Sequence, residues 1–106
     1  MGVLSHLEPK SVFTYFERLC AVPHGSGNTK LISDLCVAMA RELGLKYRQE
    51  ACNNVIIWKD ASAGYENAAP VILQGHMDMV CAQTEDCAKD MAREGLDLAT
   101  DGDYVW

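Results

Sequence analysis

Apolar residues repeat at helical spacing in two segments of the first half of the chain. The first segment follows Pro9, which suits the first turn of a helix because the N–H that it lacks would have no partner there, and it ends at Pro23. Its apolar positions recur three or four residues apart, as on one face of a helix: Val12, Phe13, Phe16, Leu19 and Cys20. This spacing predicts an amphipathic helix.

A second helix is predicted after the turn-forming sequence HGSGN at residues 24–28, whose last residue, Asn28, is a candidate helix cap. Gly44 stands where helices often end in a left-handed residue. The apolar face between these two points consists of Leu31, Ile32, Leu35, Met39 and Leu43. The two segments therefore predict a pair of helices joined by a short, glycine-containing turn.

Beyond Gly44 the pattern changes to period two, which is typical of strands. Residues 45–51 alternate in polarity, and residues 55–58 (VIIW) are apolar on both faces. A third apolar run, residues 71–73 (VIL), follows a polar loop, and near the end an Asp101-Gly102 turn signal separates two short strands. The polar residues between these elements predict loop. The order predicts an α/β fold, with helices packed on a mixed sheet, in which residues 1–106 form one domain or a part of one.

Composition and charge narrow the classes of function. The chain of 106 residues has nine Lys and Arg against fifteen Asp and Glu, a net charge of −6, and no basic stripe, so nucleic acid and anionic membranes are poor partner candidates. No apolar run is long enough to span a membrane, and the amino terminus lacks the features of a secretory signal. Five cysteines without a CxxC pair argue against a disulfide framework or a zinc knuckle. These features predict a cytoplasmic protein with reduced thiols, of which Cys20 and Cys36 fall on apolar helix faces.

The candidate chemistry lies in the sequence QGHMDMV, residues 74–80, directly after the third apolar run. Alternate side chains of an extended chain share a face, so His76 and Asp78 point the same way, with Cα atoms roughly 6.6 Å apart, while Met77 points to the other side. His76 can be a metal ligand whose ring is oriented by Asp78. The pair can instead belong to a nucleophile triad with Cys81, or both residues can be structural. The pattern alone leaves these three interpretations open.

The longer string VILQGHMDMV, residues 71–80, resembles the first metal-site motif of the M20 clan of co-catalytic zinc peptidases, and in particular of the aminoacyl-histidine dipeptidases. Three longer segments resemble the same family. Residues 12–34 resemble its first two helices and the turn between them, residues 53–80 resemble a strand, a loop and the metal-bearing strand, and residues 97–106 resemble the segment before the next metal motif. The resemblance covers essentially the whole chain.

The resemblance implies roles for two residues of this chain. His76 corresponds to the histidine ligand of one zinc ion, and Asp78 to the acidic residue that orients that imidazole and is counted as catalytic. The family's other ligands and its general base lie downstream, so the chain is interpreted as a truncated, amino-terminal part of the catalytic domain. The resemblance implies a parent enzyme with two zinc ions that hydrolyses Xaa-His or similar dipeptides. We expect the chain alone to be inactive, because a catalytic zinc takes about three protein ligands.

Three further expectations follow. The alternative function is a non-catalytic, peptidase-like module that binds a partner. Self-association, to a homo-oligomer, is expected because residues 55–58 or residues 71–73 would lack some cover if neighbouring strands are missing. Outside the motif, His24 is interpreted as a solvated turn residue, and Met77 and Met79 as packing residues.

Overall fold

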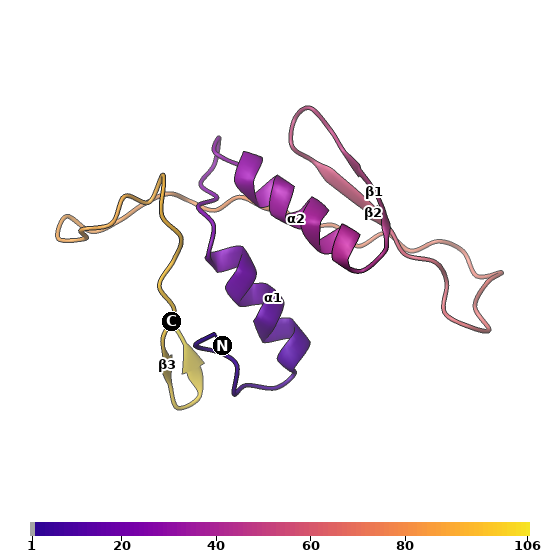
Figure 1. Cartoon of the computed structure of the whole chain (residues 1–106), viewed down its shortest axis with the longest axis horizontal. Helices are drawn as coiled ribbons and strands as arrows, with labels where there is room; N and C mark the ends of the chain where they lie inside the picture. The colour runs from indigo at the N-terminus through magenta and orange to yellow at the C-terminus, as the bar shows by residue number, and fades with distance from the viewer. Residues whose placement is uncertain (1) are drawn as a thin grey trace.

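The computed structural model describes residues 2–106, which form two helices and two separate hairpins (Figure 1). The sheets are antiparallel and two-stranded, one pairing β1 with β2 and the other pairing β3 with β4. The elements in chain order are α1 (Lys10–Cys20), α2 (Lys30–Glu42), β1 (Lys46–Gln49), β2 (Val55–Trp58), β3 (Thr100–Asp101) and β4 (Tyr104–Val105). The α/β class is confirmed, as are both helices and the turn at Gly102, whose φ is 56°. In place of one mixed sheet, residues 2–106 form two separate antiparallel sheets.

The helix ends follow local chemistry with one exception. Gly44, at φ 66°, has the left-handed conformation predicted for the end of α2, and its N–H donates to the carbonyl of Arg41. The prediction that Asn28 caps α2 is wrong. The N-cap is Thr29, and Asn28 instead donates its side-chain amide to the carbonyl of Ala92, 2.9 Å away. A long-range partner thus takes the side chain that a purely local pattern assigns to the cap.

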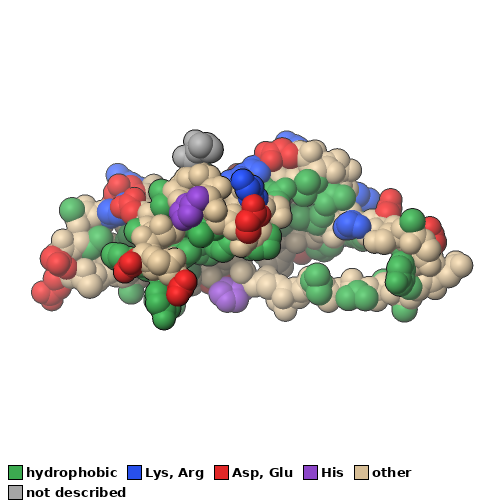
Figure 2. Space-filling model, turned by 90° about the horizontal axis from the view of Figure 1, so that it is seen from below, with side chains coloured by type: hydrophobic (Ala, Val, Ile, Leu, Met, Phe, Trp, Pro, Cys, Tyr) green, Lys and Arg blue, Asp and Glu red, His purple; other side chains and the backbone are tan. Residues whose placement is uncertain are grey.

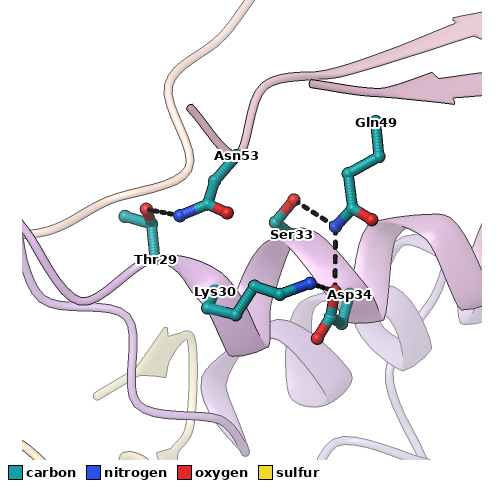
Figure 3. A network of polar contacts seen from close by, with 6 residues as sticks. All are labelled: Thr29, Lys30, Ser33, Asp34, Gln49 and Asn53. Carbon is teal, nitrogen blue, oxygen red and sulfur yellow. Dashed lines mark hydrogen bonds and ion pairs between the residues drawn. The ribbon is translucent and has the colours of Figure 1, made fainter. Parts of the chain in front are cut away.

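The hairpin of β1 and β2 is held on α2 by a network of polar contacts (Figure 3). The side-chain amide of Gln49, at the end of β1, donates to the hydroxyl of Ser33 and to the carboxylate of Asp34, both at 2.8 Å. In the turn, Asn53 donates to the hydroxyl of Thr29 at 3.1 Å. Ser33 is fully buried, so its contact with Gln49 satisfies a hydroxyl that water cannot reach.

The core is small, and four of its six residues belong to α2. It consists of Leu4, Cys20, Ile32, Val37, Met39 and Ala40. Several residues of the predicted apolar stripes stay outside it, among them Phe16 of α1 and Leu31 of α2, which are 43% and 52% exposed. The helices have the predicted amphipathic pattern, but part of each apolar face has nothing packed on it.

Residues 71–73, predicted as a third strand, form no ladder among residues 2–106. Val71, Ile72 and Leu73 are 83%, 89% and 93% exposed. In Figure 2, hydrophobic side chains line a thin part of the molecule that stands apart from the rest. A strand needs a neighbour to pair its backbone N–H and C=O groups, and the described chain places none beside this segment. The predicted lack of cover is therefore confirmed for residues 71–73, and β2 is partly exposed as well.

The dimensions show how much surface this leaves open. The radius of gyration is 16.3 Å, against about 13 Å for a compact domain of this length. The accessible surface is 8339 Å², against roughly 5,900 Å² for a folded monomer of this mass. The chain therefore buries less of itself than an ordinary small domain does.

Candidate active site

The site lies where the extended segment after residue 73 passes the connection between α1 and α2 (Figure 1). Two backbone hydrogen bonds join them. The N–H of Met79 donates to the carbonyl of His24 at 2.9 Å, and the N–H of Ser26 donates to the carbonyl of Met79 at 3.0 Å. They form a parallel bridge between Gly25 and Met79. This bridge brings the glycine-containing turn and the HMD sequence together.

Gly25 is required at this crossing by space. A Cβ on Gly25 would lie 2.8 Å from the Cβ of Cys81, well inside ordinary contact. The two backbones therefore approach as closely as the bridge needs only because residue 25 has no side chain. The composition of HGSGN indicates a turn, but it does not indicate the partner of the first glycine.

His76 and Asp78 lie together on one side of the segment. Nδ1 of His76 is 2.8 Å from the backbone carbonyl of Asp78 and 3.1 Å from its Oδ1. Both partners are acceptors when the carboxylate is ionised, so Nδ1 carries the proton and donates. In the neutral ring the lone pair is then on Nε2, the arrangement found in metal-binding histidines whose other nitrogen donates to a carboxylate or carbonyl.

Met77 points to the opposite side, as the alternation predicts. Its Sδ lies 3.7 Å from Sγ of Cys36 on α2, in a partly buried contact. The packing role expected of Met77 is confirmed. Packing on one side of the segment leaves the other side, with His76 and Asp78, facing outwards.

The second carboxylate oxygen of Asp78 has its own partner, the hydroxyl of Ser26, whose Oγ lies 2.6 Å from Oδ2. The hydrogen bond from Ser26, followed by that from His76, holds the pKa of Asp78 below its ordinary value, although partial burial acts in the other direction. Asp78 is therefore a carboxylate at neutral pH. The sequence pattern does not distinguish Ser26 from the other residues of the turn. The one signal that could have found it is a hydroxyl inside a glycine-rich turn.

The His76 side chain is 83% exposed and that of Asp78 is 40% exposed, so the ring is open to a ligand. Within residues 2–106, no group of three or more His, Cys, Asp and Glu side chains is placed to hold a metal ion. His76 thus fits the part of one metal ligand, with Asp78 as its orienting partner, and the remaining ligands would have to come from elsewhere. Cys81 makes no hydrogen bond to His76 or Asp78, so the geometry gives no support to a nucleophile triad.

His24 departs from its predicted role as a solvated residue. It is only partly exposed, its Nδ1 lies 2.7 Å from the carbonyl of Val22, and it lines a small pocket with Met79 and Cys81. The bridge to Met79 draws the turn inwards, which the local sequence could not indicate. His24 supports the site through its backbone carbonyl.

Comparison with known proteins gives a consistent result. No family model matches the chain. It is 33% identical over 105 residues to the cytosol non-specific dipeptidase of Escherichia coli (strain K12), an alignment covering 99% of this chain and 22% of that protein. Its fold is similar to the crystal structure of aminoacylhistidine dipeptidase from Vibrio alginolyticus, with a TM-score of 0.89 and 33% identity, over 98% of this chain and 21% of that one.

The chain thus spans about a fifth of the length of these relatives. Among the described residues, neither helix is long and apolar enough to cross a bilayer. The resemblance inferred from the motifs is confirmed: over nearly its whole length, this chain is similar in sequence and in fold to dipeptidases, one of them an aminoacylhistidine dipeptidase.

Proposed function

We propose that this chain is part of a zinc-dependent dipeptidase in which His76 is a metal ligand and Asp78 holds its ring. The observation that carries the proposal is the hydrogen bonding of His76, whose Nδ1 is engaged by two acceptors of Asp78 while the ring is exposed. The similarity to two dipeptidases supports the class of reaction. The proposed substrates are dipeptides, including those of the Xaa-His type.

In this proposal Asp78 has two tasks. It fixes the His76 tautomer in which the lone pair is on Nε2. Its negative charge also makes that nitrogen a stronger ligand for a cation. Zinc, when bound, supplies Lewis-acid polarisation of the peptide carbonyl and a water that ionises near neutral pH.

The proposed location, by analogy with the relative named for the cytosol, is cytosolic.

The 106-residue chain is proposed to be inactive alone, and two zinc ions are proposed for the complete enzyme. A catalytic zinc takes about three protein ligands, whereas the described residues offer His76 without two companions. Incubation of the chain with zinc and a Xaa-His dipeptide tests the first statement. Turnover above that of a His76→Ala chain would contradict it.

The role of His76 is tested in the full-length polypeptide of which this chain is proposed to be part. We expect His76→Ala to lower both zinc content and dipeptide hydrolysis. Residues that only support a ligand typically lower metal affinity or activity about 10–100-fold when mutated. We expect a larger decrease when the ligand itself is removed. His6→Ala is the matched control, because His6 is an exposed histidine outside the site. Normal zinc content and hydrolysis in the His76→Ala protein would refute the proposal.

The absence of a three-residue metal cluster among residues 2–106 also fits a second candidate, a non-catalytic peptidase-like module that binds a partner. Zinc stoichiometry and hydrolysis by the full-length polypeptide separate the two. A polypeptide that binds no zinc and cleaves no dipeptide, yet folds, favours the module. Two bound zinc ions and hydrolysis favour the enzyme.

A further inference from the structure

Ser26 is separated from Asp78 by 52 positions in the sequence, yet its hydroxyl makes the shortest contact in the candidate site, 2.6 Å from Oδ2. We propose that Ser26 is a positioning residue, which fixes the carboxylate of Asp78 and, through it, the imidazole of His76. The inference rests on the proposed function, because it assigns Ser26 a part in the same reaction.

Both oxygens of the Asp78 carboxylate have a hydrogen-bond partner. Asp78 can rotate about its terminal bond with little preference, since such torsions are broad. Its Oδ1 contact to His76 is 3.1 Å and the ring is largely exposed, so water competes for both groups. The contact from Ser26 to Oδ2 has the short length typical of an O–H donor to a carboxylate. With both oxygens bound, the carboxylate plane is fixed, and Oδ1 stays directed at the ring.

Ser26 is itself held in place by the backbone. Its N–H donates to the carbonyl of Met79 at 3.0 Å, and the turn that contains it is closed by a 2.9 Å bond from the N–H of Asn28 to the carbonyl of Gly25. The Ser26 hydroxyl also lies 3.4 Å from the Met79 carbonyl. A hydroxyl has one proton to donate, and the shorter contact places that proton on the side of Asp78.

The backbone bridge and the Ser26 hydroxyl act one after the other. The backbone bridge sets the position of Ser26, Ser26 sets the plane of the Asp78 carboxylate, and Asp78 sets the ring of His76. Loss of the hydroxyl removes the middle step and leaves the bridge intact, because the bridge uses only backbone groups. This separation makes a positioning role distinguishable from a general effect on folding.

The test uses the full-length polypeptide with Ser26→Ala, Ser26→Thr and, as a matched control, Ser11→Ala, an exposed serine in the first turn of α1. We expect Ser26→Ala to lower kcat about tenfold, the lower end of the range for residues that support a metal ligand, with KM unchanged. Ser26→Thr keeps the hydroxyl and restores most of kcat. An unchanged kcat in Ser26→Ala, or an equal loss in the alanine and threonine variants, overturns the proposal.

A second measurement reads the ring directly and does not depend on turnover. In the metal-free polypeptide labelled with ¹⁵N-histidine, the His76 signals are identified by their absence from a His76→Ala sample. We expect the wild-type ring to carry its proton on Nδ1. The Ser26→Ala ring keeps the 2.8 Å contact to the Asp78 backbone carbonyl but loses the fixed carboxylate, so we expect part of its population to shift to the other tautomer. If the polypeptide hydrolyses no dipeptide, the proposed function fails, and this measurement still decides the role of Ser26. Identical ¹⁵N chemical shifts of the His76 ring in the wild-type and Ser26→Ala proteins would overturn the proposed role of Ser26.

Discussion

The close approach of Gly25 to Cys81 gives a prediction whose sign opposes the usual rule for glycine. Replacing glycine by alanine normally stabilises a protein by about 0.4–1 kcal/mol where the backbone conformation allows it, because the unfolded chain loses freedom. Gly25 has no positive φ, so its conformation is open to alanine. A Cβ at this position would nevertheless lie 2.8 Å from the Cβ of Cys81, where ordinary contact begins at 3.4 Å.

The backbone on one side must therefore move. Forcing extra atoms into a tight contact costs about 1–3 kcal/mol, which exceeds the gain expected from the unfolded chain. This movement weakens the two hydrogen bonds of the bridge, from Met79 to His24 and from Ser26 to Met79. Each of them contributes about 0.5–1.5 kcal/mol to stability. We expect Gly25→Ala to destabilise the bridge specifically.

Amide hydrogen exchange measures this at the two donors, Ser26 and Met79. We expect their exchange to accelerate about 5- to 150-fold, the factor that corresponds to about 1–3 kcal/mol. Gly75→Ala is the control, because a Cβ there meets nothing within 4 Å. Cys81→Gly removes the opposing Cβ, so the double variant Gly25→Ala/Cys81→Gly should lose less protection than the two single effects added together. Unchanged exchange in Gly25→Ala, or strict additivity in the double variant, would refute the reasoning.

Two further predictions concern the exposed apolar segment and the contact between the helices. Burying one isoleucine contributes about 1.5–3 kcal/mol, so Ile72→Lys should raise the Kd for self-association of the 106-residue chain at least about tenfold. Sedimentation velocity measures this Kd. A wild-type chain that stays monomeric would contradict the expected self-association. The guanidinium of Arg18 donates two hydrogen bonds to Glu42, at 2.7 and 2.8 Å, and thereby lowers the pKa of Glu42. The stability from this pair is present above the ordinary glutamate pKa of about 4.3 and is lost as pH falls through the lowered value, so the denaturation midpoints of wild type and Glu42→Gln should differ at pH 7 and converge in acid. A difference that persists at pH 2 would contradict this.

The sequence predicted the elements that depend on residues close together in the chain. Both helices follow from apolar spacing, and Gly44 and Gly102 adopt the positive φ that their positions predict. The strand β1 follows from the change to period two, and β2 from the apolar run at residues 55–58. Period and turn chemistry act over a few residues, so they can be recognised before any tertiary contact is known.

Predictions that depended on a distant partner were less successful. Residues 71–73 have the composition of a strand, but the described chain offers them no neighbour, and their backbone forms no ladder. Asn28 is a residue type that often caps helices, but its side-chain amide donates to the carbonyl of Ala92. His24 was expected in solvent and is drawn inwards by Met79. For Asn28 and His24, a contact that the sequence does not specify outweighs the local preference. For residues 71–73, the partner that a strand needs is missing from the described chain.

For the candidate site, the sequence alone determined that His76 and Asp78 share one side of an extended segment, because alternation in such a segment is fixed by backbone geometry. The motif also determined the resemblance to dipeptidases. Only the tertiary structure decided that the segment crosses the turn at Gly25, and that Ser26 meets the second oxygen of Asp78. The physical reason is that a hydrogen bond across 52 residues depends on where two backbones pass each other, which no local pattern records.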